Sequence, residues 1–276
     1  MLLRVDEVPV PDEPNGVGGP EDRQASSTAN LRRANRQHLA DLLAGGAEEW
    51  GEKEGLAFFA NPFVDGGLIT SFLAVRHLLS FYSVKRAVVF HPRTPQVEAL
   101  RFSGHLRWHD LMLAGLSPRV SPIVRRTCDR HLIERLGEMA MGERTSLARA
   151  AGRPVIAQLK FDPEPRVFAA LLINPRLIED DLVSFIASGR SARGSLEMIA
   201  RDRKWSVRSS VRLALLKNPA TPPSVCVGFL TSLRKEDLLG IWRHPKTSEL
   251  IRRAAQNVLE ARLPGGRGQE REKEPR

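Results

Sequence analysis

The fold is decided by a stretch that the chain carries twice. Residues 84–136 read VKRAVVFHPRTPQVEALRFSGHLRWHDLMLAGLSPRVSPIVRRTCDRHLIERL, and residues 211–263 read VRLALLKNPATPPSVCVGFLTSLRKEDLLGIWRHPKTSELIRRAAQNVLEARL. The two stretches align without a gap at a constant offset of 127 residues, with 17 identities in 53 positions. Because chance does not produce that many identities without gaps, the sequence predicts a repeat protein.

A shorter period runs through the same region. A partial third copy, VFAALLINPRLIEDDLVSFI, begins at Val167. Apolar residues recur at helical spacing, and convincing alternating strand patterns are absent. Each Val-Arg-like helix starts around one apolar anchor residue, and the anchors are spaced 40, 43, 44 and 40 residues apart: Val84, Val124, Val167, Val211 and Ile251. A period of 40–44 residues predicts an all-α chain of about five repeats with two amphipathic helices in each.

Proline marks the turns between these helices. Pro92 and Pro219 stop the preceding helix, because proline lacks the N–H that a helix interior needs. Thr94-Pro95 and Thr221-Pro222 predict a threonine hydroxyl at the N-cap and a proline at the first helical position.

The sequence resembles the HEAT-like repeat superfamily, close to the bacterial repeats described as leucine-rich variants. The resemblance covers roughly residues 55–263, and it is carried by the Asn-Pro turns at 174 and 218 and by three helix starts: Val124-Arg125-Arg126, Val211-Arg212-Leu213-Ala214 and Ile251-Arg252-Arg253-Ala254. It implies a right-handed superhelical solenoid of helical hairpins. Members of the superfamily serve as scaffolds, enzyme maturation factors, protein carriers and, in one branch, DNA glycosylases.

The ends of the chain depart from the repeat pattern. Residues 1–30, and again residues 264–276, are rich in Pro, Gly and charge, which predicts disordered tails. Residues 31–82 are expected to form a capping helix over Leu31–Leu43 and a degenerate first repeat, ahead of regular repeats over residues 83–263. Five phenylalanines in and after this region form either a packed cap or a docking patch, with packing favoured: Phe58, Phe59, Phe63, Phe72 and Phe81.

The charge is positive and unevenly placed. Lys and Arg number 42 against 32 Asp and Glu, a formal charge of +10, while residues 1–30 carry −4 and residues 101–276 carry +13. An acidic partner is therefore expected. Aromatic residues make up 6% of the chain, which fits contact with phosphates or acidic surfaces better than base stacking.

Cations follow the buried anchors. Residues one and two places after a buried helical residue turn away from the core, so these side chains are expected to form a basic ladder along the repeated helices. The candidate binding residues are Lys85, Arg86, Arg125, Arg126, Arg166, Arg208, Arg212, Arg252 and Arg253. The alternative is an ordinary helix surface solvated with arginine, whose stems cover apolar neighbours.

Few residues offer chemistry. His105 and His109, at i and i+4, would share one helix face and form a weak candidate metal pair, but no third ligand is placed nearby, so no metal or cofactor is expected. The carboxylates of residues 179–181 are explained by a helix N-terminus. Cys128 and Cys226 are expected to be buried thiols in a reduced compartment. With no secretory signal or membrane span, a cytoplasmic protein with no membrane contact is expected.

Three hypotheses for function follow. The leading one is a non-enzymatic solenoid scaffold or adaptor that binds a protein partner with an acidic surface. The second is a nucleic-acid-binding solenoid that contacts phosphates. The third is a DNA glycosylase-like or metal-dependent enzyme, which requires a cleft-facing carboxylate beside Trp108 or Trp205, or a third ligand near the two histidines. The oligomeric state is left open.

Overall fold

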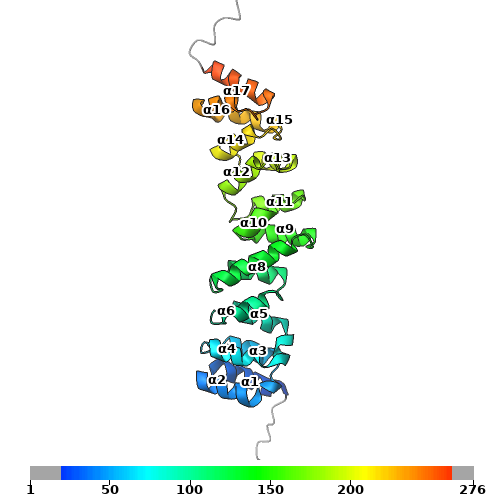
Figure 1. The fold of residues 1–276 in the computed structure, drawn as a ribbon, viewed down its shortest axis with the longest axis vertical. Helices are drawn as coiled ribbons and strands as arrows, with labels where there is room; N and C mark the ends of the chain where they lie inside the picture. The colour runs from blue at the N-terminus through cyan, green and yellow to red at the C-terminus, as the bar shows by residue number, and fades with distance from the viewer. Residues whose placement is uncertain (1–19, 263–276) are drawn as a thin grey trace, which may run out of the picture. The chain divides into compact units, whose positions relative to one another are not determined.

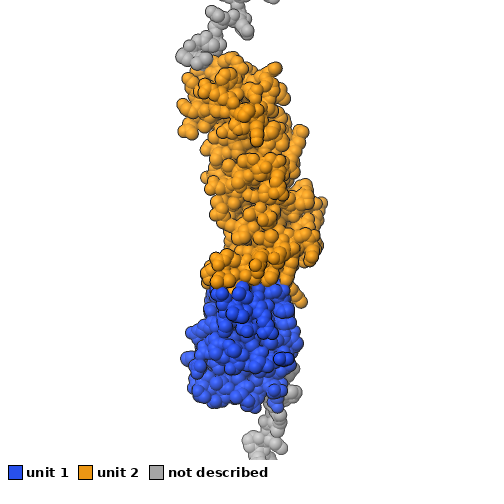
Figure 2. Space-filling view, viewed as in Figure 1, with its two compact units in different colours: residues 1–106, 119–121 blue, residues 107–118, 122–276 orange. Residues whose placement is uncertain are grey.

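The computed structural model describes residues 20–262, and every regular element in that range is a helix. The predicted tails over residues 1–19 and 264–276 lie outside the described residues. The chain divides into two compact units (Figure 2). Unit 1 comprises residues 1–106 and 119–121, and unit 2 comprises residues 107–118 and 122–276.

Unit 1 contains six α-helices: α1 (Pro20–Arg33), α2 (Arg36–Gly46), α3 (Glu52–Phe59), α4 (Gly66–Leu73), α5 (Tyr82–Phe90) and α6 (Gln96–Ser103). Two 3₁₀ turns, η1 (Ala47–Glu49) and η2 (Arg76–Ser80), connect them. Helix α3 packs against α1 and α5, and α6 packs against α5. The fold of this unit is therefore built from contacts between helices close in the sequence.

Two predictions for the start of the chain are wrong. The disordered tail was expected to reach residue 30, but α1 begins at Pro20. The single capping helix over 31–43 is instead the end of α1 and most of α2. The break falls at Asn35, whose side chain accepts a hydrogen bond from the backbone N–H of His38 and caps α2.

The phenylalanine cluster is a packed core. Phe58 and Phe72 are fully buried and their rings stack with centroids 4.8 Å apart. Phe59 meets Phe72 edge-on at 5.0 Å, and Trp50 lies 6.2 Å from Phe58. Only Phe63 is strongly exposed among these rings. The packing interpretation of the cluster is therefore correct for Phe58, Phe59 and Phe72.

Unit 2 contains helices that follow one another in chain order in Figure 1, where α8 to α17 are labelled. Helix α8 packs against α7, α11 against α9, α14 against α12 and α17 against α16. Their bounds are α7 (Trp108–Leu116), α8 (Pro122–Arg135), α9 (Met141–Ala150), α10 (Arg153–Leu159), α11 (Pro165–Leu172), α12 (Glu179–Ala187), α13 (Arg193–Arg201), α14 (Ser209–Lys217), α15 (Pro223–Cys226), η3 (Val227–Ser232), α16 (Lys235–Arg243) and α17 (Glu249–Ala261).

The duplication in the sequence is reproduced in the helix bounds. Helices α5 and α14 begin and end 127 residues apart, and so do α7 and α16. All five anchors are at most 1% exposed. Each is the third residue of its helix, in α5, α8, α11, α14 and α17. The repeated sequence therefore sets helix starts and buried positions in the same register.

Each period holds three α-helices, where two were predicted, and the last period also holds η3. Between Val84 and Val124, for example, the chain forms α5, α6 and α7. The extra break follows α6, at Gly104 and the turn before α7. The predicted threonine caps are also wrong, because Pro95 and Pro222 take the N-cap positions of α6 and α15. The hydroxyl of Thr94 instead donates to the carbonyl of Val88 at 2.7 Å.

Buried asparagines tie neighbouring segments together. The amide of Asn174 donates to the carbonyls of Ala148 and Ala151 at 2.8 and 3.2 Å, and its oxygen accepts from the backbone N–H of Arg176. Asn61 makes the same pattern of bonds to Leu31, Ala34 and Phe63. The Asn-Pro turn thus satisfies carbonyls at the end of an earlier helix, which explains its recurrence.

Both cysteines are buried free thiols, as predicted. Burial raises the pKa of Cys128 to about 12 and that of Cys226 to about 11. Among the described residues no helix has the length and apolarity to cross a membrane.

Candidate binding groove

A groove of about 610 Å³ lies within unit 2, between α12, α14 and the turns that follow α12, α14 and α16. Its apolar lining comes mainly from Val183, Ile186 and Leu213, with three alanines and two prolines around them. None of its lining residues carries a carboxylate, while Lys217 and Lys246 both contribute to the wall. The groove is therefore apolar with a positive edge, and its volume is in the range that small-molecule and peptide-side-chain sites occupy.

Three turns shape the groove. Helix α12 ends at Ala187, and Gly189 follows with φ at +70°, the left-handed conformation that glycine adopts without strain. Asn218 fixes the turn after α14: its amide donates to the carbonyl of Ile186 at 2.6 Å, and its oxygen accepts from the N–H of Ala220 at 2.8 Å. In the third turn, at His244-Pro245, the N–H of Thr247 bonds the carbonyl of His244, as the N–H of Thr221 bonds the carbonyl of Asn218.

Leu213 accounts for the apolar character of the site. It is the second residue after the anchor Val211, a position where α5, α8 and α17 carry Arg86, Arg126 and Arg253. In α14 that position carries an aliphatic side chain, which also packs against the core cluster that includes Leu216 and Ile251. Leu213 thus adds an aliphatic side chain to the groove where three other helices carry arginine.

Two polar atoms in the groove wall are buried without a hydrogen-bond partner. They are the hydroxyl oxygen of Ser210 and Nδ1 of His244. Partial burial lowers the pKa of the His244 imidazole, and the positive charges of Lys217 and Lys246 lower it further. A negative group in the groove would face both lysines.

The predicted basic ladder divides into two groups. In the first, the arginine is held by the fold. The guanidinium of Arg212 donates to the carbonyl of Ser206 and, at 2.8 Å, to the hydroxyl of Ser232. Arg252 donates to Glu249 and to the carbonyls of His244 and Thr247. Arg125 and Lys85 are likewise only partly exposed. These side chains were expected to face solvent, but each follows its anchor by one residue and is only partly exposed.

In the second group the cation is exposed. It comprises Arg86, Arg126, Arg166, Arg208 and Arg253. Arg86 lies over the ring of Phe90 at 4.8 Å, and Arg253 bonds Glu249 at 3.1 Å. The row of exposed cations is interrupted on α11 and α14. In α11 the anchor Val167 is followed by Phe168 and Ala169, and in α14 Leu213 stands two places after the anchor Val211. Within unit 2 the cations therefore do not form a continuous ladder.

The predicted histidine pair does not share a helix. His105 lies in the turn after α6, and His109 lies in α7, because Gly104 ends α6 before His105 is reached. Both side chains are exposed. The described residues contain no group of three side chains that could hold a metal ion.

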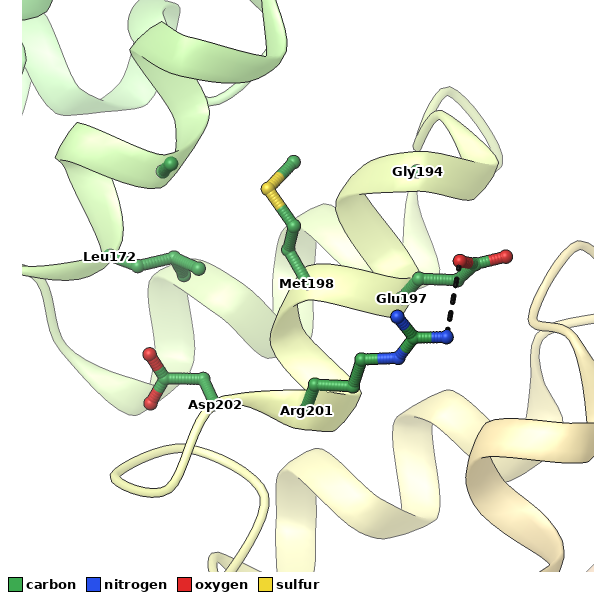
Figure 3. Close-up of a pocket in the computed structure, with 7 residues that line it drawn as sticks. Leu172, Gly194, Glu197, Met198, Arg201 and Asp202 are labelled. Atoms are coloured by element: carbon green, nitrogen blue, oxygen red, sulfur yellow. Dashed lines mark ion pairs between the residues drawn. The ribbon is translucent and has the colours of Figure 1, made fainter.

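The carboxylate beside Trp205 serves the backbone. Figure 3 shows a shallow pocket where Asp202 follows the end of α13 and Glu197 pairs with Arg201 at 3.8 Å. One oxygen of Asp202 accepts from the N–H groups of Lys204 and Trp205. Trp205 is 3% exposed and its indole N–H donates to the carbonyl of Leu172. Asp202 and Trp205 thus stabilise a turn, and the buried indole offers no aromatic face to a base.

The four tryptophans differ in exposure. Trp242 is 40% exposed on α16, and Trp108 is partly exposed at the start of α7. Trp50 and Trp205 are buried.

Sequence reasoning missed the groove residues. Leu213 was named only as part of a helix start, and Lys217, His244 and Lys246 were not singled out. One signal in the sequence is leucine at position 213, where α5, α8 and α17 carry arginine.

Comparison of the chain with protein-family models, with curated proteins and with solved structures finds no match in any of the three.

Proposed function

We propose that the protein is a non-enzymatic, cytoplasmic α-solenoid module that binds a protein partner in the groove between α12 and α14. The solenoid is supported by the anchor period and by the matching bounds of α5 and α14 and of α7 and α16. The right-handed superhelix expected from the HEAT-like resemblance belongs to the same proposal.

The groove carries the proposal. It combines an apolar lining, two lysines and no lining carboxylate, which suits an extended segment with aliphatic side chains next to acidic ones. The partner is accordingly a protein with an acidic surface.

Selection from a displayed library of random peptides tests the proposal. Recovered peptides are expected to lose binding to the Ala187→Glu variant, which places a carboxylate in the groove from an exposed position and removes no core contact. Ala169→Glu is the matched control, because Ala169 is an exposed alanine of α11 that lines the separate pocket of Figure 3. If selection yields no peptide that distinguishes the two variants, the proposal is wrong.

A second candidate function is nucleic-acid binding, favoured by exposed arginines of unit 2. Arg126, Arg166 and Arg208 are exposed, and their side chains make no hydrogen bond or ion pair with other described residues. Such binding would contact phosphates and weaken steeply with salt. Retention of the protein on duplex or single-stranded DNA at low salt, reduced by Arg126→Ala, would support it, and no retention at low salt would remove it.

A further inference from the structure

The turns built on a residue followed by proline share one backbone pattern. In four of them the residue after the proline donates its backbone N–H to the side chain of the residue before the proline, at 2.7–3.3 Å: Phe63 to Asn61, Arg93 to His91, Arg176 to Asn174 and Ala220 to Asn218. Arg93 stands 127 residues before Ala220, the offset of the duplication, and Arg176 stands 44 residues before it, the spacing of the anchors Val167 and Val211. These two arginines and Ala220 therefore occupy the same position in three turns.

An arginine at this position bonds an earlier turn. The guanidinium of Arg93 donates to the carbonyls of Pro62 and Val64 at 2.8 and 3.1 Å, between α3 and α4. The guanidinium of Arg176 donates to the carbonyl of Ala150, the last residue of α9, at 3.2 Å. Each side chain thus spans from its own turn to an earlier one, and its apolar stem covers the surface between them.

The turns at Asn174 and Asn218 lie in the same way on the helix that precedes them. Asn174 donates to the carbonyl of Ala148 in α9 at 2.8 Å, and Asn218 donates to the carbonyl of Ile186 in α12 at 2.6 Å. Since Arg176 reaches the end of α9 from the first of these turns, an arginine at position 220 would reach the end of α12 from the second.

The groove lies where that arginine would extend. Ala220 is exposed and lines the groove, as do Ala187 at the end of α12 and Gly189 in the turn after it. The side chain of alanine is too short to cross from one turn to the other. Alanine at this position therefore leaves uncovered a surface that arginine covers in two other turns.

We propose that Ala220 is the specificity-determining residue of the groove, because it leaves open the space that an arginine stem fills elsewhere in the repeat. An aliphatic side chain of the protein partner takes the place of that stem, which suits leucine, isoleucine or methionine. Acidic residues of the partner pair beside it with Lys217 and Lys246. This proposal rests on the proposed function, because it requires the groove to be a binding site.

Thiol labelling of the full chain measures whether the groove is open without any partner. Ala214→Cys places a thiol in the groove wall at a partly exposed position, while both native cysteines are buried. Adding Ala220→Arg is expected to slow the reaction of the new thiol with iodoacetamide about tenfold, because the arginine covers it. Rates are compared per thiolate, from the pH dependence of labelling, because a nearby cation also lowers the pKa of a thiol. Adding Ala169→Arg, on the exposed alanine of α11, is the matched control and is expected to leave the rate unchanged.

Peptides recovered from the displayed random library on the native chain provide a second measurement. Their affinity is expected to fall about tenfold or more for Ala220→Arg, because the arginine stem occupies the place of the aliphatic side chain. Ala220→Ser keeps the side chain small, and Ala169→Arg adds the same charge elsewhere, so both should bind the peptides as the native chain does. Loss of folding is not the expected cause, because Arg93 and Arg176 occupy this position in the native fold.

Two results would overturn the inference: labelling of the Ala214→Cys thiol that Ala220→Arg leaves unchanged, or recovered peptides that bind the Ala220→Arg chain as tightly as the native chain. Either result leaves the proposed function standing if the selection yields peptides that Ala187→Glu rejects. A selection that yields none removes the proposed function and this inference with it, while the labelling still shows whether arginine closes the groove. The two failures are therefore distinguishable.

Discussion

Replacing Asn218 by alanine tests how neighbouring repeats are joined. Asn218 is 8% exposed, and its side chain bonds the carbonyl of Ile186, the hydroxyl of Ser191 and the N–H of Ala220 at 2.6, 3.2 and 2.8 Å. Alanine removes all three bonds and leaves the carbonyl of Ile186 buried without this donor. At about 1 kcal/mol for each bond, the free energy of unfolding is expected to fall by about 3 kcal/mol.

The structure also predicts where Asn218→Ala destabilises the chain. The bonds of Asn218 connect the turn after α14 to the end of α12, so the variant should weaken the contact between these two segments before it weakens either helix. Urea unfolding followed by circular dichroism gives the change in the free energy of unfolding, and amide hydrogen exchange locates it. Faster exchange is expected in α12 and α14, with little change in α7 and α8.

Asn257→Ala is the matched control, because Asn257 is exposed on α17 and alanine is a better helix former. Its free energy of unfolding is expected to stay within about 0.5 kcal/mol of the native value. If Asn218→Ala falls within that same margin, the buried asparagine does not join the repeats and the reasoning is wrong.

Three further outcomes are expected. In an NMR titration, the pKa of His244 should lie below its ordinary value of 6.5, and the variant Lys217→Gln with Lys246→Gln should raise it. As the pH falls below 6.5, the unfolded chain takes up a proton that the folded chain does not, so the free energy of unfolding should decrease. A titration midpoint at or above 6.5 would contradict this expectation. Cys128 and Cys226 should resist alkylation by iodoacetamide in the folded protein and react in urea, since burial raises both thiol pKa values; rapid labelling of the native protein would show the opposite. Arg212→Ala should lower the free energy of unfolding by about 2 kcal/mol, because Arg212 bonds Ser206 and Ser232. Arg126→Ala, at an exposed position, should change it by less than about 0.5 kcal/mol. Equal effects in urea unfolding would refute the division of the cations into held and exposed groups.

The sequence alone predicted the helical class, the duplication and the anchors. Val84, Val124, Val167, Val211 and Ile251 are buried, and each is the third residue of its helix. These features depend on helical periodicity and on local proline signals, which act over a few residues and can be read without knowledge of the packing.

Some local boundaries could not be read in this way. Pro20 and the acids after it have the composition of a tail, yet they begin α1, whose residue Leu31 is buried. Pro95 and Pro222 displaced the expected threonine caps. Proline and acidic residues occur both in disordered tails and at helix starts, and packing against a neighbouring segment decides which of the two forms.

Only the tertiary structure decided which repeated positions are available for binding. Arg212 stands one place after the buried Val211 and Arg126 stands two places after the buried Val124; the guanidinium of Arg212 meets Ser206 and Ser232, while Arg126 stays exposed. The groove is likewise assembled from α12, α14 and three turns, with Leu213 in place of a cation. Sequence periodicity sets which face of each helix is buried, but which side chains meet across segments depends on packing between residues distant in the sequence.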